Sequence, residues 1–170
     1  MNNQTVLQNL TDCSIELQKI QESINFVGQS HSIVPFLTNY AVIKCCGTIE
    51  NSFKTIITDF HNSLPQQAKN YIEETFYKSS INPSKDNIHK SLEKFDPAWN
   101  LAFKTKLNLE ADKSRIEFSL KSLNNARNEF AHGGRPTVTF QNIFMYFNDA
   151  KRIIEILDEV IIIKTKKNEP

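Results

Sequence analysis

The chain has 170 residues and a mass of 19.6 kDa, which suits a single domain with a substantial hydrophobic core. Hydrophobic residues make up 39% of it, and it holds 12 Phe but only 4 Gly and 6 Pro, a composition typical of helical globular proteins rather than disordered or all-β ones. The net charge of +1 excludes the strongly basic field of a general nucleic-acid binder, so any contact with RNA must come from a local patch.

The first part of the chain contains two long amphipathic patterns that predict helices. Apolar residues recur at alternating steps of four and three through residues 6–27, and Gly28 ends this pattern. Pro35 opens the next segment, in which residues 42–60 form a wide apolar face. These spacings predict two long helices, of which the second ends near His61.

The middle of the chain has a weaker pattern. Pro65 is well placed as the first residue of a third helix, and residues 84–95 predict a short fourth one. The whole stretch 78–108 is interpreted as an elaborated connection within one domain rather than a linker between domains. The reason is that several of its large side chains require burial: Phe95, Trp99, Leu101 and Phe103.

The last third of the chain predicts two long helices. Residues 109–131 form the first, and Gly133-Gly134 breaks it sharply. Thr139 caps the second, which carries two apolar rows and is therefore either central to its own bundle or part of an oligomer interface. Residues 164–170 read as a solvated tail. We therefore expect a single all-α domain over residues 1–170, an antiparallel bundle of four to five main helices with a short helical insertion.

The sequence offers no sign of secretion, membrane insertion or metal binding. No signal peptide opens the chain, and no apolar run is long enough to span a bilayer, so a cytoplasmic protein is expected. The three cysteines form neither a disulfide framework nor a zinc pattern, and the four histidines are scattered. We expect no metal and no cofactor.

The most informative segment lies at the end of the helix predicted over residues 109–131. Its apolar row runs through Ile116, Leu120 and Leu123 and then reaches Arg127, where a leucine or isoleucine would be expected. A buried cation is costly unless it is paired or has a function. His132 follows at the end of the same helix and supplies a group that titrates near neutral pH.

Helical geometry separates Arg127 from His132. Five residues correspond to about 140° of rotation and about 7.5 Å of rise, so the two side chains do not share a face. His132 lies over Asn128 instead, with Lys121 and Asn125 further along the same polar row. A purely structural interpretation remains open, in which Arg127 pairs with a carboxylate such as Glu50 and His132 caps the helix.

Two segments resemble a known family. The run Arg127-Asn128-Glu129-Phe130-Ala131-His132-Gly133 resembles the R-x4-6-H signature of the HEPN superfamily, and its Asn and Ala match the commonest version of that signature. Residues 42–53, which include Glu50 on a long early helix, are similar to the helix that precedes this motif in RiboL-PSP or MAE-type HEPN proteins.

The resemblance implies a small helical bundle that dimerises so that two motifs line one cleft. Active members of the family are metal-independent endoribonucleases, often toxins or defence effectors. By this resemblance His132 moves protons, Arg127 stabilises charge on the phosphate, and Asn128 positions either the phosphate or the imidazole. Glu50 holds Arg127, and Glu129 is a second supporting residue.

The expected partners are therefore single-stranded RNA, a second copy of the chain and an antitoxin protein, with no membrane. The alternative is a catalytically inactive HEPN-like module that binds a partner protein, such as a nucleotidyltransferase antitoxin, or a nucleotide.

Overall fold

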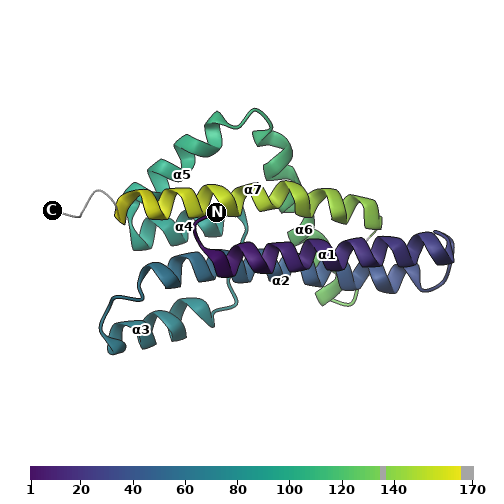
Figure 1. Ribbon diagram of the computed structural model, residues 1–170, viewed down its shortest axis with the longest axis horizontal. Helices are drawn as coiled ribbons and strands as arrows, with labels where there is room; N and C mark the ends of the chain where they lie inside the picture. Colours follow the sequence, from purple (N-terminus) through teal and green to yellow (C-terminus); the bar gives the residue numbers. More distant parts are fainter. Residues whose placement is uncertain (135–136, 166–170) are drawn as a thin grey trace.

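A computed structural model describes residues 1–134 and 137–165, with side chains described up to residue 161. Within these residues it contains seven α-helices, one short π-helical segment and no strand, which confirms the predicted all-α class. Figure 1 shows α1 and α2 side by side as an antiparallel pair, with α7 running along the same long axis and α6 crossing it steeply. The insertion helices α4 and α5 gather at one end of this frame.

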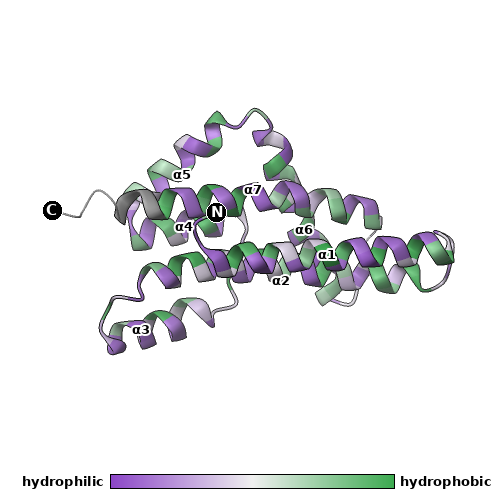
Figure 2. Ribbon diagram, viewed as in Figure 1, coloured by the Kyte–Doolittle hydropathy of each residue, from purple (hydrophilic) through white to green (hydrophobic). Residues whose placement is uncertain are grey.

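Helices α1 (Gln4–Val27) and α2 (Val34–Phe60) have the predicted extents. Asn3 caps α1 by accepting a hydrogen bond from the backbone N–H of Val6, and Gly28 ends it at φ 90°, a conformation that favours glycine. The alternating steps of four and three put the apolar side chains of α1 on one buried face. Figure 2 shows the resulting alternation of hydrophobic and hydrophilic residues along α1 and α2.

Helix α7 (Phe140–Thr165) is the centre of the molecule. It packs most extensively against α2 and α6 and also contacts α5 and α1. Thr139 caps it as predicted, because its hydroxyl accepts a hydrogen bond from the N–H of Asn142 at 3.2 Å. Residues of both apolar rows are buried within the single chain, among them Ile153, Ile156 and Leu157. Neighbouring helices of the same chain therefore account for the apolar character of α7.

The middle of the chain, from α3 to α5, is more regular than the sequence pattern indicated. Helix α3 (Gln66–Ile72) continues into the π-helical segment η1 (Glu73–Tyr77), and α4 (Lys85–Phe95) is followed directly by α5 (Pro97–Leu109). Asp96 and Pro97, which follow the helix predicted over residues 84–95, are the N-cap and the first residue of α5. Of the side chains expected to need burial, Trp99 and Phe103 are buried, but Leu101 is exposed.

Helix α6 (Lys113–Ala131) begins four residues later than predicted. Leu109 ends α5 and is exposed, and Glu110 caps that helix, so residues 110–112 form a turn. At the other end of the chain, residues 164 and 165 still belong to α7, whereas the rest of the predicted tail, 166–170, lies outside the described residues. In the described part of the chain, no helix is both long and apolar enough to cross a membrane.

Candidate functional site

The motif predicted from the sequence lies at the C-terminal end of α6, which closes in a Schellman arrangement. The N–H of Gly133 donates to the carbonyl of Phe130 at 3.0 Å, and that of Gly134 donates to the carbonyl of Glu129 at 2.9 Å. Gly133 has φ 81°, a backbone conformation that residues other than glycine rarely adopt. The two glycines thereby stop the helix immediately after His132.

Arg127 lies at the edge of the α6 core face rather than within it. Its side chain is 38% exposed, and the adjacent Ala126 takes the buried position, so the expectation of a cation inside a buried row was wrong. Phe130, expected next in that row, is 39% exposed.

Two neighbours orient the guanidinium group of Arg127. Its Nη1 donates to Oδ1 of Asn128 at 3.3 Å, and its Nη2 lies 4.0 Å from Oε2 of Glu50 on α2. Glu50 also pairs with Lys54 one turn further along α2, at 2.7 Å between Oε1 and Nζ. The structure thus brings Arg127, Asn128 and Glu50 together, and one carboxylate is shared between two cations.

Cys46 forms the floor below this ion pair. Its Sγ lies 3.3 Å from the carbonyl oxygen of Leu123, and its side chain is almost completely buried. Burial raises the pKa of the Cys46 thiol to about 12, while the nearby charge of Arg127 acts in the opposite direction. The thiol is therefore neutral, and α2 and α6 pack closely beneath the exposed cation.

His132 is the C-cap residue of α6 and is exposed to solvent. Its backbone N–H still donates to the carbonyl of Asn128 at 3.0 Å, so helical geometry persists up to this residue. Among the described residues, no hydrogen bond or ion pair engages its imidazole. The structure therefore does not join His132 to Arg127 within one chain. Glu129 is also exposed. Its backbone carbonyl accepts the hydrogen bond from Gly134 that closes the helix.

A cavity of about 660 Å³ adjoins the motif at Asn128. It lies between α6 and the start of α4. Lys121, Asn125 and Asn128 all line it, as expected for residues that share one face of a helix. Its other wall was missed by sequence reasoning. Asn82 and Asn87 lie more than 25 residues before the start of α6 in the chain, and only the fold brings them opposite it.

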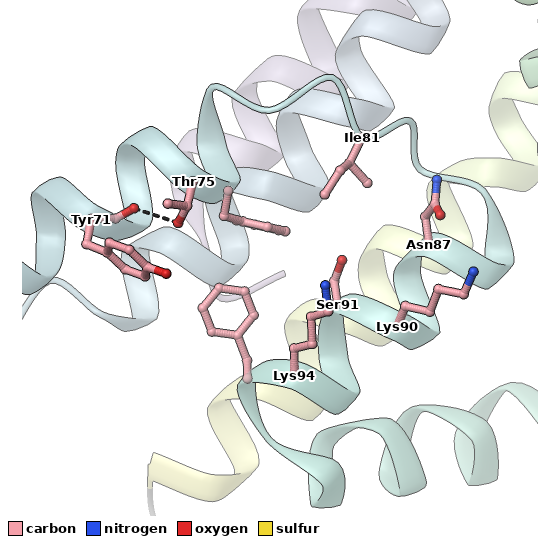
Figure 3. Close-up of a pocket in the computed structure, with 9 residues that line it drawn as sticks. Tyr71, Thr75, Ile81, Asn87, Lys90, Ser91 and Lys94 are labelled. Carbon is pink, nitrogen blue, oxygen red and sulfur yellow. Dashed lines mark hydrogen bonds between the residues drawn. The ribbon is translucent and has the colours of Figure 1, made fainter.

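A second cavity, of about 440 Å³, lies between α4 and the α3–η1 segment. Figure 3 shows Lys94 of α4 facing Tyr71 and Thr75 across it, with Lys90 further along α4. Asn87 lines both cavities, so a polar surface continues from the motif towards these two lysines. Lys90 and Lys94 therefore place two positive charges on this surface, although the net charge of the whole chain is only +1.

The motif provides groups for acid–base and phosphate chemistry. Within the described residues, no three His, Cys, Asp or Glu side chains gather closely enough to hold a metal ion. The motif offers a half-exposed guanidinium group, a carboxamide and an exposed imidazole, which can bind an anion and move a proton.

Comparison with known proteins identifies the family. Neither the curated proteins nor the solved structures gave a match. A family model described as RiboL-PSP-HEPN, however, matches residues 7–162, which include all of α2 to α6, most of α1 and α7, and the whole motif of α6. This match agrees with the resemblance carried by the two quoted segments, and the chain belongs to the RiboL-PSP-HEPN family.

Proposed function

We propose that this protein is a metal-independent endoribonuclease that cleaves single-stranded RNA. The observation that carries the proposal is that one helix end presents both a half-exposed Arg127, next to Asn128 and Glu50, and an exposed His132. The family assignment supports it, since HEPN domains commonly act on RNA. We further propose a cytoplasmic role as a toxin of a toxin–antitoxin pair or as an antiphage effector.

The chemistry requires only groups that the motif supplies. RNA carries its own nucleophile, the 2′-hydroxyl. His132 takes the 2′-hydroxyl proton, the 2′-oxygen attacks the adjacent phosphorus, and the bond from phosphorus to the 5′-oxygen breaks. The leaving 5′-oxygen takes a proton from water, and the other product ends in a 2′,3′-cyclic phosphate. Arg127 stabilises the charge that develops on the phosphate, with its guanidinium fork oriented by Asn128 and Glu50.

A homodimer would complete this site. Arg127 and His132 lie on different faces of α6, so one copy presents them in different directions. Two copies related by a two-fold axis can place Arg127 of one protomer opposite His132 of the other. The exposed side chain of Phe130, between them in the motif, gives such an interface an apolar contact.

Growth after induction tests this proposal in cells. We expect wild type to arrest growth and to leave RNA fragments that end in cyclic phosphates, because the cleavage needs no external nucleophile. Arg127→Ala and His132→Ala should each relieve the arrest at matched protein levels. Thermal melts must show that both variants stay folded.

Two results would contradict the nuclease. One is a folded, abundant wild type that leaves growth and RNA intact, which would favour the partner-binding module. The other is arrest that both variants retain.

A further inference from the structure

The cavity between α4 and the α3–η1 segment carries positive charge that the protein itself leaves unpaired. Lys90 and Lys94 of α4 line it one helical turn apart, and no carboxylate is among the described residues around it. In the part of the chain that the structure describes, neither ammonium group forms an ion pair or a hydrogen bond. Like charges at this spacing destabilise a helix, so an anion bound between them would stabilise α4.

Ser91 adds a polar group between the two lysines. It is only 6% exposed, yet its hydroxyl makes no hydrogen bond to any described residue. Ser14 and Ser23, which also lie within helices, donate instead to the carbonyl four residues before them. Ser91 lines the cavity, and Figure 3 shows its hydroxyl and the Lys94 ammonium group directed towards the open space. One hydroxyl donor and two cations are therefore available to the several acceptor oxygens of a phosphate.

The opposite wall of this cavity is aromatic. Tyr71 of α3 lines it and is 69% exposed. Phe76 and Phe95 form an apolar floor, where their rings meet edge to face with centroids 5.0 Å apart. The volume of about 440 Å³ lies in the range of small-molecule sites and is larger than a lone phosphate needs. Cations that bind phosphate beside an exposed aromatic ring are typical of sites for single-stranded nucleic acid.

The cavity also adjoins the surface that leads to the motif of α6. Asn87 of α4 lines it and lines the neighbouring cavity as well, whose far end is Asn128. Asn128 in turn accepts a hydrogen bond from Arg127. Seven residues of α4, or about 10 Å, separate Asn87 from Lys94. One RNA strand can therefore lie along α4 and reach both Arg127 and the two lysines.

We propose that this cavity binds one nucleotide of single-stranded RNA outside the cleavage site. The phosphate of that nucleotide lies on Lys90, Ser91 and Lys94, and its base stacks on Tyr71. The proposal rests on the proposed nuclease function and names where its substrate is held. Because the cavity lies apart from the motif, these residues contribute to the affinity for RNA and not to the chemical step.

A short 2′-O-methyl RNA strand tests the phosphate contact, because its blocked 2′-oxygens prevent cleavage. We expect Lys90→Gln/Lys94→Gln to bind it about tenfold more weakly than wild type at low salt, since charge-assisted hydrogen bonds to the phosphate are lost. The slope of log Kd against log salt concentration should become shallower by about 0.7, the value for one phosphate of a single strand. Lys19→Gln/Lys104→Gln removes the same charge at exposed positions outside this cavity and should leave both quantities unchanged.

An abasic oligomer with the same phosphates tests the base contact. Tyr71→Ala should weaken binding of the base-containing strand by about tenfold and leave binding of the abasic one unchanged, whereas Tyr71→Phe keeps the ring and should bind as wild type does. Ser91→Ala should weaken binding of both oligomers by about threefold. It should also melt no lower than wild type, because the hydroxyl that it removes has no partner among the described residues.

The outcomes distinguish this site from the nuclease. Equal affinities of the two double lysine variants, or full binding of the base-containing strand by folded Tyr71→Ala, overturn the nucleotide site even if wild type cuts natural RNA. If natural RNA is cut, Lys90→Gln/Lys94→Gln should raise KM and leave kcat unchanged, and a fall in kcat alone contradicts a site apart from the chemistry. Binding that depends on the lysines and on Tyr71, by a wild type that never cuts natural RNA, supports the nucleotide site and overturns the nuclease.

Discussion

At the scale of single residues, Glu50 shares its charge between Arg127 and Lys54. The contact with Lys54 is the shorter of the two, and Lys54 is the more buried cation. From the sequence, Glu50 could be proposed as a partner of Arg127 because both fall on helices that pack together. Its second bond, to Lys54, follows the i, i+4 spacing of the two residues on α2, whereas the bond from Lys54 to the carbonyl of Ser79, 25 residues further along the chain, could not be predicted.

Exchanging Glu50 for a neutral isostere tests whether it holds Arg127. We expect Glu50→Gln to slow RNA cleavage by about tenfold, as loss of an orienting partner commonly does. Lys54→Met is the matched control, because it removes the other cation and leaves the contact between Glu50 and Arg127. Initial cleavage rates under identical conditions provide the measurement. Equal rates for wild type and Glu50→Gln would show that Arg127 needs no carboxylate.

At the scale of elements, helix ends marked by unambiguous signals were predictable. Gly28 and Gly133 both have positive φ, and both helices end where the sequence indicated. The boundary between α5 and α6 was not predictable, because residues 110–112 contain neither glycine nor proline and the apolar spacing continues across them. Asp96-Pro97 was ambiguous for another reason, since an N-cap followed by proline has the same composition as a turn.

The Schellman end of α6 leads to a prediction with a matched control. Gly133→Ala and Gly28→Ala should each lower the free energy of unfolding by about 1 kcal/mol, because alanine disfavours the positive φ at both sites. Only Gly133→Ala should also slow RNA cleavage, since it shifts the helix end that presents His132. Urea titrations and cleavage assays measure the two effects. Unchanged cleavage by Gly133→Ala would mean that this helix end does not position the imidazole.

At the scale of the whole molecule, α7 holds the insertion in place through charge as well as apolar contact. Arg152 on α7 donates to Glu110, in the turn before α6, at 2.7 Å and also pairs with Glu159. Hydrogen bonding to Arg152 lowers the pKa of the Glu110 carboxyl, and hydrogen bonding to Lys106 lowers that of Glu159. The cavity beside Asn128 depends on this arrangement and could not be predicted, because its two walls come from distant segments.

These lowered pKa values fix how the stability depends on pH. The stabilisation is present above the ordinary glutamate pKa and is lost as the pH falls through the lower folded-state values. Arg152→Gln should therefore cost about 1 kcal/mol at neutral pH and little at a pH well below the glutamate pKa of about 4.3. Urea unfolding at both pH values is the test, and a cost that does not shrink on acidification would contradict the role of these carboxylates.

Mixing two inactive variants tests the proposed dimer. If Arg127 of one protomer acts with His132 of the other, a heterodimer of Arg127→Ala and His132→Ala retains one intact site of two. Random exchange should then restore about a quarter of wild-type cleavage, because half of the dimers are mixed and each has one site. Mixtures that stay inactive despite verified subunit exchange would place both groups of a site on one chain.

The central claim is that Arg127 and His132 cleave RNA without a metal. The most direct measurement is incubation of total RNA in excess EDTA with wild type, Arg127→Ala or His132→Ala, followed by analysis of the fragment ends. The account predicts fragments with 2′,3′-cyclic phosphates from wild type alone. Cleavage that EDTA abolishes, or equal cleavage by folded His132→Ala, would contradict it.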